Sequence, residues 1–206
     1  MKEAEALLKE VEVELTFPEG VRPVRALGRD ATFKGQVVTA SLGSLGAQQR
    51  RYVLIEAELA PTKVGVTLEV AQVKARYYDA VSEQRRSLES ALQVSAVAEE
   101  AQAKGSERAE VMEEVLSLLA TEKQKLAVSL RDKGDREGAA QVLRSSAAML
   151  KSGAKRYKSK KLDTLSAESA EESEKVKSSG ADWSRTRKMM RQKSYKAASQ
   201  RRTERG

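Results

Sequence analysis

Residues 53–59 are VLIEAEL and residues 64–70 are VGVTLEV, and their alternation decides the fold of the first half of the chain. In both segments an apolar residue stands at every second position. A period of two is typical of a strand with one buried and one exposed face, as in a half-exposed antiparallel sheet. The same parity returns near the end of the run and predicts further buried-face residues, namely Leu88, Leu92, Val94 and Ala96.

More strands are expected before this stretch. Residues 11–17 alternate in the same way, and Pro18-Glu19-Gly20 is a turn sequence. Residues 43–46 are expected to form a tight connection. The apolar parity slips by one between Val70 and Val73, which predicts a β-bulge or a bend near Ala71-Gln72. Residues 1–98 are therefore predicted to form a small antiparallel β-sandwich.

The periodicity then changes to that of a helix. Ser106 is expected to cap a first helix, whose apolar stripe is Val111, Val115, Leu118, Leu119, Leu126 and Leu130. Gly134 should end this helix, Asp135 should cap a second one, and Gly153 should end that one. Residues 99–153 are thus predicted to be an αα-hairpin. The fold class is α+β, with the strands and the helices in separate parts of the chain.

The last quarter of the chain is polar and then basic. Residues 154–182 are rich in Ser, Lys and Glu, which predicts a polar linker or a short helix. Residues 183–206 hold nine Lys or Arg and one Glu. Subtraction from the totals of 38 and 30 leaves 29 basic and 29 acidic residues elsewhere, so the net charge of +8 lies in this segment. It is predicted to be a basic tail that serves assembly rather than folding.

Composition excludes several kinds of chemistry. The chain has no His and no Cys, which excludes Ser-His-Asp and Cys-His catalysis, zinc sites built on His or Cys, and disulfides. Two same-face carboxylate pairs, Glu12 with Glu14 and Glu56 with Glu58, lie on the polar side of their strands and are interpreted as solvated. We therefore expect no enzyme, no cofactor and no metal site. No apolar run approaches the roughly 20 residues of a membrane span, and no signal peptide precedes residue 10, so a cytoplasmic location is expected.

Four segments resemble the region that follows the von Willebrand factor A (vWA) domain in a group of bacterial vWA proteins. They are residues 41–59 (SLGSLGAQQRRYVLIEAEL), 70–79 (VAQVKARYYD), 132–140 (DKGDREGAA) and 191–195 (RQKSY). The resemblance implies that this chain is the C-terminal accessory region of such a protein. Its β-sandwich would then brace a vWA domain, and its helices would face a partner.

The vWA domain itself is missing from these residues. Its metal site needs Asp-x-Ser-x-Ser at the end of a buried strand, and the near match here is DWSRT at residues 182–186. The preceding residues 175–180 are too polar for a buried strand, so the match is interpreted as chance. We expect the vWA domain upstream in a longer product or on a separate polypeptide.

The basic segment supplies the candidate partner-binding residues. Apolar and aromatic side chains are interleaved with its cations, a combination typical of protein docking. The candidates are Trp183, Arg185, Arg187, Lys188, Met189, Met190, Arg191 and Tyr195. Docking on a partner or on the chain's own body, a solvated arm, and contact with nucleic acid all remain open. The leading hypothesis is a non-enzymatic protein–protein interaction or scaffolding module, and the alternative is a nucleic-acid-associated protein that binds through this segment. A homo-oligomer is also open.

Overall fold

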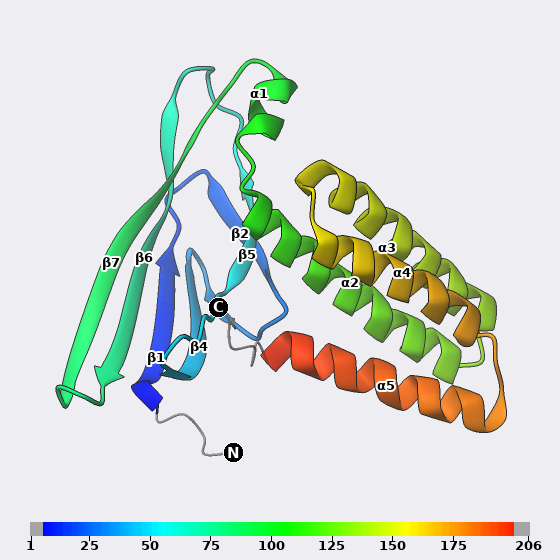
Figure 1. Ribbon diagram of the computed structural model, residues 1–206. Helices are drawn as coiled ribbons and strands as arrows, with labels where there is room; N and C mark the ends of the chain where they lie inside the picture. The colour runs from blue at the N-terminus through cyan, green and yellow to red at the C-terminus, as the bar shows by residue number, and fades with distance from the viewer. Residues whose placement is uncertain (1–5, 200–206) are drawn as a thin grey trace. The chain divides into compact units, whose positions relative to one another are not determined.

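The protein is known from a computed structural model that describes residues 6–199 (Figure 1). Strands come first and helices follow, which confirms the predicted α+β class. The described chain divides into two compact units, and the boundary along the sequence falls between Ser106 and Glu107. The sequence placed this boundary at residue 98, eight residues too early, because the short helix α1 (Glu100–Gly105) belongs to the strand-containing unit.

Two antiparallel sheets make up the first unit. The larger sheet has the order β3-β4-β1-β6-β7 and the smaller one pairs β2 with β5. The strands are β1 (Ala6–Thr16), β2 (Val21–Leu27), β3 (Thr32–Lys34), β4 (Val37–Gly46), β5 (Leu54–Leu59), β6 (Thr67–Asp79) and β7 (Gln84–Ser95). The predicted turn at residues 18–20 is confirmed, with Gly20 at φ +88°. The predicted bulge is confirmed between Glu69 and Ala71.

Residues 43–46 differ from the prediction. They form the end of β4 and pair with β1 through irregular register, rather than making a tight connection. Gly43 has φ +70°, a backbone conformation that favours glycine. The glycines that suggested a turn therefore allow a bent strand to continue.

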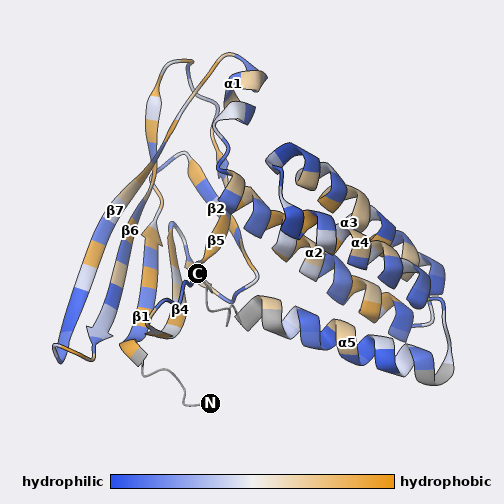
Figure 2. Cartoon of the chain, in the orientation of Figure 1, coloured by the Kyte–Doolittle hydropathy of each residue, from blue (hydrophilic) through white to orange (hydrophobic). Residues whose placement is uncertain are grey.

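The core of this unit lies between the two sheets. Leu15, Phe17, Val21, Val38 and Ala71 are buried together, and Ile55 and Ala57 of β5 pack against them. On the opposite face of β5, Glu56 pairs with Arg25 at 2.7 Å. The alternation along β5 thus has the predicted faces, and Figure 2 shows the alternating hydropathy of the strands.

Strand β7 contradicts the predicted burial. Leu88, Leu92 and Val94 are 63%, 49% and 42% exposed, although Leu92 pairs with the buried Ala71 and therefore shares its face. The reason is the difference in width between the sheets. The core cluster draws on β1, β4 and β6 of the five-stranded sheet but on no residue of β7. The alternation predicted the correct face, but the second layer needed to bury it is only two strands wide.

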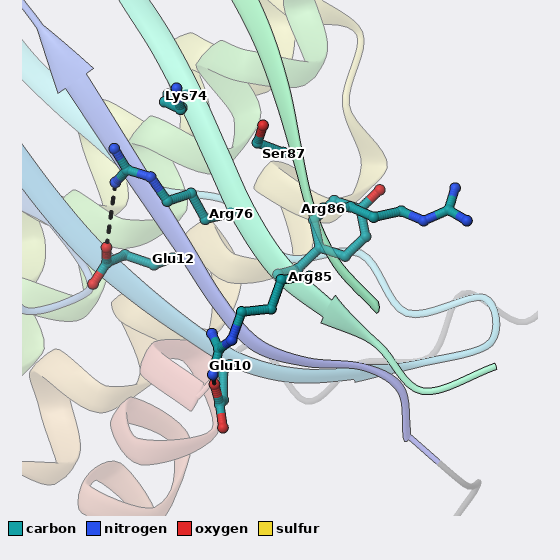
Figure 3. A pocket seen from close by; sticks show the side chains of 8 residues that line it. Glu10, Glu12, Lys74, Arg76, Arg85, Arg86 and Ser87 are labelled. Carbon is teal, nitrogen blue, oxygen red and sulfur yellow. Dashed lines mark hydrogen bonds and ion pairs between the residues drawn. The ribbon is translucent and has the colours of Figure 1, made fainter. Parts of the chain in front are cut away.

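The outer face of the large sheet carries a charged depression of about 450 Å³ (Figure 3). Its charges are paired across the strands: Arg76 lies 3.8 Å from Glu12, and Arg85 lies 2.8 Å from Glu10. Arg76 also reaches Glu14 at 3.3 Å. The Glu12 and Glu14 carboxylates are therefore partners of an arginine on an exposed surface, as the solvated interpretation expects.

The second unit consists of helices α2 (Ala109–Asp132), α3 (Arg136–Tyr157), α4 (Lys160–Lys175) and α5 (Gly180–Ser199). Helix α2 contacts all three others. Ser106 ends α1 instead of capping α2, whose N-cap is Arg108. The next boundary is as predicted: Gly134 has φ +94°, and the Asp135 side chain accepts a hydrogen bond of 2.8 Å from the Gly138 amide.

Gly153 does not end α3, which continues to Tyr157. A Cβ at Gly153 would collide with Leu116 Cδ1 of α2 and lie 3.2 Å from Leu162 Cδ1 of α4. The glycine therefore allows three helices to approach closely. Helix α3 ends instead at Lys158, in the left-handed conformation with φ 51°.

Helix α4 occupies most of the segment predicted as a linker or short helix. Leu162 and, just past the helix end, Val176 are fully buried. The buried residues of the helix between them are three serines and Glu172, and Ser166 Oγ donates a 2.8 Å hydrogen bond to the Ala147 carbonyl of α3. Small side chains let α3 and α4 pack closely, so a segment with few large apolar residues still folds against its neighbours.

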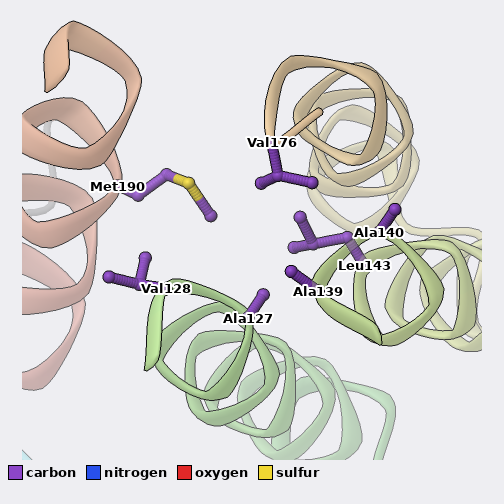
Figure 4. Packing of buried hydrophobic residues seen from close by; sticks show 7 residues of the cluster. All are labelled: Ala127, Val128, Ala139, Ala140, Leu143, Val176 and Met190. Atoms are coloured by element: carbon purple, nitrogen blue, oxygen red, sulfur yellow. The ribbon is translucent and has the colours of Figure 1, made fainter. Parts of the chain in front are cut away.

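Helix α5 replaces the predicted tail over residues 183–199 and also takes in the last three residues of the predicted linker. Met190 is 1% exposed and completes a cluster with Ala127 and Val128 of α2, Leu143 of α3 and Val176 (Figure 4). The segment is therefore part of the helical core, and not an arm outside it. The remaining residues of the predicted tail, 200–206, lie outside the described part of the chain.

Candidate functional site

The buried stripe of α5 is short and mostly polar. Thr186, Met190 and Ser194 recur at four-residue spacing and are buried. Trp183 packs at the edge of the same cluster. Two of these three residues carry a hydroxyl, so the buried face of α5 differs little in hydropathy from its exposed faces. Only the tertiary structure therefore shows which face of α5 is covered.

Arg131 of α2 holds the start of α5 in place. Its Nε donates to the Val176 carbonyl and its Nη2 to the Ser178 carbonyl, both at 2.6 Å. Its guanidinium lies 5.0 Å from the centre of the Trp183 ring. This nearly buried cation therefore satisfies two carbonyls at the end of α4 and stacks on the one tryptophan of the chain.

The neighbouring Asp132 binds two arginines of α5. Its Oδ2 accepts from Arg187 Nε at 3.0 Å and Nη2 at 2.7 Å, and from Arg191 Nη2 at 3.3 Å. Two guanidinium groups around one carboxylate leave an excess positive charge at this place. The side chains are partly exposed, so the pairs contribute modestly to stability but orient the arginines.

On its other side α5 is tied to α2 and α4 by a polar network. Ser194 donates to Gln124 at 2.8 Å, and Gln124 donates to the buried Glu172 at 2.7 Å. Lys193 reaches Glu172 at 2.9 Å and Glu168 at 3.1 Å. Desolvation lowers the pKa of Lys193, but these hydrogen bonds outweigh it and raise that pKa above its ordinary value. This network positions α5. It also pairs Lys193, one of the cations of α5, with carboxylates of α4.

A groove of about 550 Å³ lies along α2 and α5. It is lined by Lys125, Val128, Ser129, Asp132, Lys133, Arg191, Ser194 and Tyr195. Three of these side chains are cations and one is a carboxylate, and that carboxylate is already engaged by two arginines. Val128 and the 67% exposed Tyr195 add apolar surface. The groove can accept a negatively charged group beside an apolar one.

The structure divides the predicted partner-binding residues into two sets. Trp183 and Met190 pack against the helical core, so they hold α5 and are not exposed contact points. The exposed or partly exposed members are Arg185, Arg187, Lys188, Met189, Arg191 and Tyr195, of which Arg191 and Tyr195 line the groove. Their role in binding stays a prediction.

Sequence reasoning missed the contribution of α2. Lys125, Ser129 and Lys133 stand at four-residue spacing, as do Val128 and Asp132. This spacing places each set on one side of a helix. In the sequence the apolar stripe of α2 is the stronger pattern, and its polar side resembles an ordinary solvated face. That α5 would lie beside it could be known only from the fold.

The near match to the vWA metal motif lies on a helix. Asp182, Ser184 and Thr186 occupy the first turns of α5, where Asp182 is exposed and Thr186 is buried. Successive positions i and i+2 of a helix point in different directions, so the three side chains do not converge. Within residues 6–199 no group of three or more His, Cys, Asp or Glu side chains could hold a metal ion. None of the described helices is both long and apolar enough to cross a membrane.

Comparison with known proteins returns little. No protein-family model matches the chain, and no curated protein matches it. Among solved structures, the chain is similar to the crystal structure of the ArnB paralog VWA2 from Sulfolobus acidocaldarius, with a TM-score of 0.41 and 17% sequence identity. The match covers 90% of this chain and 42% of that one, so this chain spans less than half the length of that protein.

Proposed function

We propose that this chain is a non-enzymatic protein-interaction module whose α2–α5 groove docks an acidic protein surface. The observation that carries the proposal is the composition of the groove, with Lys125, Lys133 and Arg191 around Val128 and Tyr195. Cations at a rim with an aromatic ring beside them are typical of a protein interface. The sequence resemblance of residues 41–59 and 70–79 further supports an accessory role beside a vWA domain, on the same or a separate chain.

The charges of α2 strengthen the argument. Within residues 6–199 neither Lys125 nor Lys133 is paired with a carboxylate, whereas Asp132 is bound to Arg187 and Arg191. Long-range attraction by such a surface speeds the encounter with an acidic partner, and salt weakens it. Tyr195 would then provide a contact that salt does not screen.

Nucleic-acid binding is the competing function, and the contacts of α5 speak against it. Arg187 is bound to Asp132, and Lys193 to Glu168 and Glu172. Neutralising phosphates would require these cations to leave their partners. Trp183, the ring best suited to stack on a base, packs on the helical core under Arg131.

Charge reversal in the groove tests the proposal. The full chain and its Lys125→Glu/Lys133→Glu variant would be titrated with a fluorescent glutamate-rich helical peptide that contains Leu and Phe. A 20-base-pair DNA duplex serves as the second probe. At about 150 mM salt we expect the native chain to bind the peptide and the variant to bind it at least about tenfold more weakly. DNA should not be retained at this salt concentration.

The matched control is Lys155→Glu/Lys160→Glu, which makes the same charge change at exposed positions of α3 and α4. It should leave peptide binding within about twofold of native. If both variants lost the same amount of peptide affinity, only the net charge would matter, and the proposal that the groove is the docking site would be overturned. Stronger retention of DNA than of peptide by the native chain would favour the nucleic-acid function.

A further inference from the structure

Among the described residues 6–199, strand β7 ends the five-stranded sheet and has β6 as its only sheet neighbour. It is 12 residues long and all of them are exposed. Along its open side, every second residue directs its amide and carbonyl away from β6. Natural proteins protect such an edge with proline, inward charges or a very short strand. Residues 84–95 contain no proline, and from residue 87 onward they carry no charge on the inner face, whereas the other edge strand, β3, has only three residues.

The inner face of β7 carries exposed apolar residues at Leu88, Leu92 and Val94, whereas Arg86, opposite Tyr77, is a charge on the same face near the start of the strand. Leu92 and Ser90 stand opposite Ala71 and Val73, which belong to the core or pack on it. Leu88, two residues before Ser90, stands on the same face and is 63% exposed. Scattered apolar residues on a surface are ordinary, but a stripe beside a free strand edge is typical of an interface.

We propose that β7 pairs antiparallel with β7 of a second copy of this chain, with the two-fold axis at Ser90. In this register residue i faces residue 180 − i of the other copy. Leu88 then lies opposite Leu92 of its partner on both sides of the axis, and Ser90 lies opposite itself. Residues that face one another have the same parity, so both inner faces lie on one side of a joined sheet.

The sequence of β7 favours this register over its neighbours. An axis at Glu89 would place two carboxylates opposite one another, and a shift by one residue would place inner side chains against outer ones. An axis at Ala91 would place each Leu92 opposite a serine. With the axis at Ser90, Glu89 faces Ala91 of the other copy and keeps its 2.6 Å contact with Lys74 of its own β6.

Sedimentation of the full chain tests the pairing. At about 100 μM we expect a dimer, and Leu92→Lys should raise the dimer dissociation constant at least about tenfold. The control is Ala91→Lys, a neighbouring residue on the outer face, where the new ammonium would face Glu89 of the other copy. It should leave the dimer intact or tighten it. Circular dichroism would verify that both variants are folded.

Single cysteines test the register, because the chain has none of its own. Ser90→Cys should form a covalent dimer under mild oxidation, since directly opposed Cβ atoms lie within reach of a disulfide. Ser87→Cys, which would face Gln93, should cross-link far less. Equal cross-linking at both positions, or a dimer that Leu92→Lys does not weaken, would overturn the proposal. So would a native monomer, and amides of β7 that are protected from exchange in that monomer would show that another part of the same chain covers the edge.

Discussion

Met189 and Met190 are adjacent on α5 but differ in environment, at 44% and 1% exposed. Met190 fills the space between α2, α3 and the end of α4. We expect Met190→Ala to lower the free energy of unfolding of the helical unit by about 2–4 kcal/mol, because it removes buried contacts and leaves a cavity. Urea unfolding monitored by the fluorescence of Trp183, which packs on the same cluster, measures the change.

Met189→Ala is the matched control for this substitution. It removes the same atoms from an exposed position of the same helix, so its effect should stay within about 0.5 kcal/mol. Equal costs at the two positions would mean that α5 does not pack through Met190. The comparison also bears on the interface, because Met189 is the methionine of this pair that a partner could reach.

Among the elements, the turn between β6 and β7 carries a carboxylate that responds to acid. Asp79 Oδ1 accepts from the amides of Val81 and Ser82 at 3.0 and 3.3 Å. Hydrogen bonds from Ser82 and Val81 and the charge of Arg86 lower the pKa of Asp79 below its ordinary value of 3.8. A carboxyl with a lowered folded pKa stabilises the protein above pH 3.8 and loses this contribution as pH falls through the folded pKa.

The corresponding experiment compares the thermal midpoint of the native chain with that of Asp79→Ala at about pH 6 and pH 2.5. The variant should be less stable at the higher pH, and the difference should shrink at the lower one. Gln84→Ala, at the start of β7, has no titrating group and should show the same difference at both. A difference for Asp79→Ala that does not change with pH would contradict the role of its charge.

The helices show where local patterns were sufficient and where they were not. Gly134 and Asp135 act within one turn of the backbone, and their predicted roles are confirmed. Gly153 has an equally strong local preference to end a helix, yet Leu116 and Leu162 from two other helices demand a small residue there. The extent of α4 was likewise not predictable from the sequence, because a face of serines packs well only when another helix lies close to it.

The whole molecule lacks histidine and cysteine, the side chains whose charge ordinarily changes near neutral pH. Shifted carboxylates move away from neutrality, because side-chain hydrogen bonds lower the pKa of Asp79, Glu89, Glu137 and Glu171. Burial raises the pKa of Tyr157, and the pKa of Lys193 is also raised. The stability linked to these carboxylates is lost only in acid, and that linked to Lys193 is lost as pH rises through its raised pKa.

We therefore expect the free energy of unfolding to change by less than about 0.5 kcal/mol between pH 5.5 and 8. Urea unfolding at several pH values in this range, at constant ionic strength, measures it by circular dichroism and by tryptophan fluorescence. Suppose instead that the free energy of unfolding changes with pH as steeply as the uptake or release of one proton on unfolding requires. That slope would show that a described carboxylate or lysine titrates near neutrality. Measurements below pH 4 serve as the comparison, because the stability linked to the shifted carboxylates should be lost there.

The sequence by itself determined the α+β class, the faces of the strands, the bulge in β6 and the boundary between α2 and α3. Each of these depends on a residue and its neighbours along the chain, through side-chain parity, backbone conformation or a cap. Only the tertiary structure decided that the two-stranded sheet does not reach β7, that Gly153 lies inside a helix and that α5 packs through Met190. It also joined Lys125, Lys133 and Arg191 in one groove. These features depend on surfaces supplied by distant segments, and burial is a property of both partners in a contact, whereas a local pattern describes one.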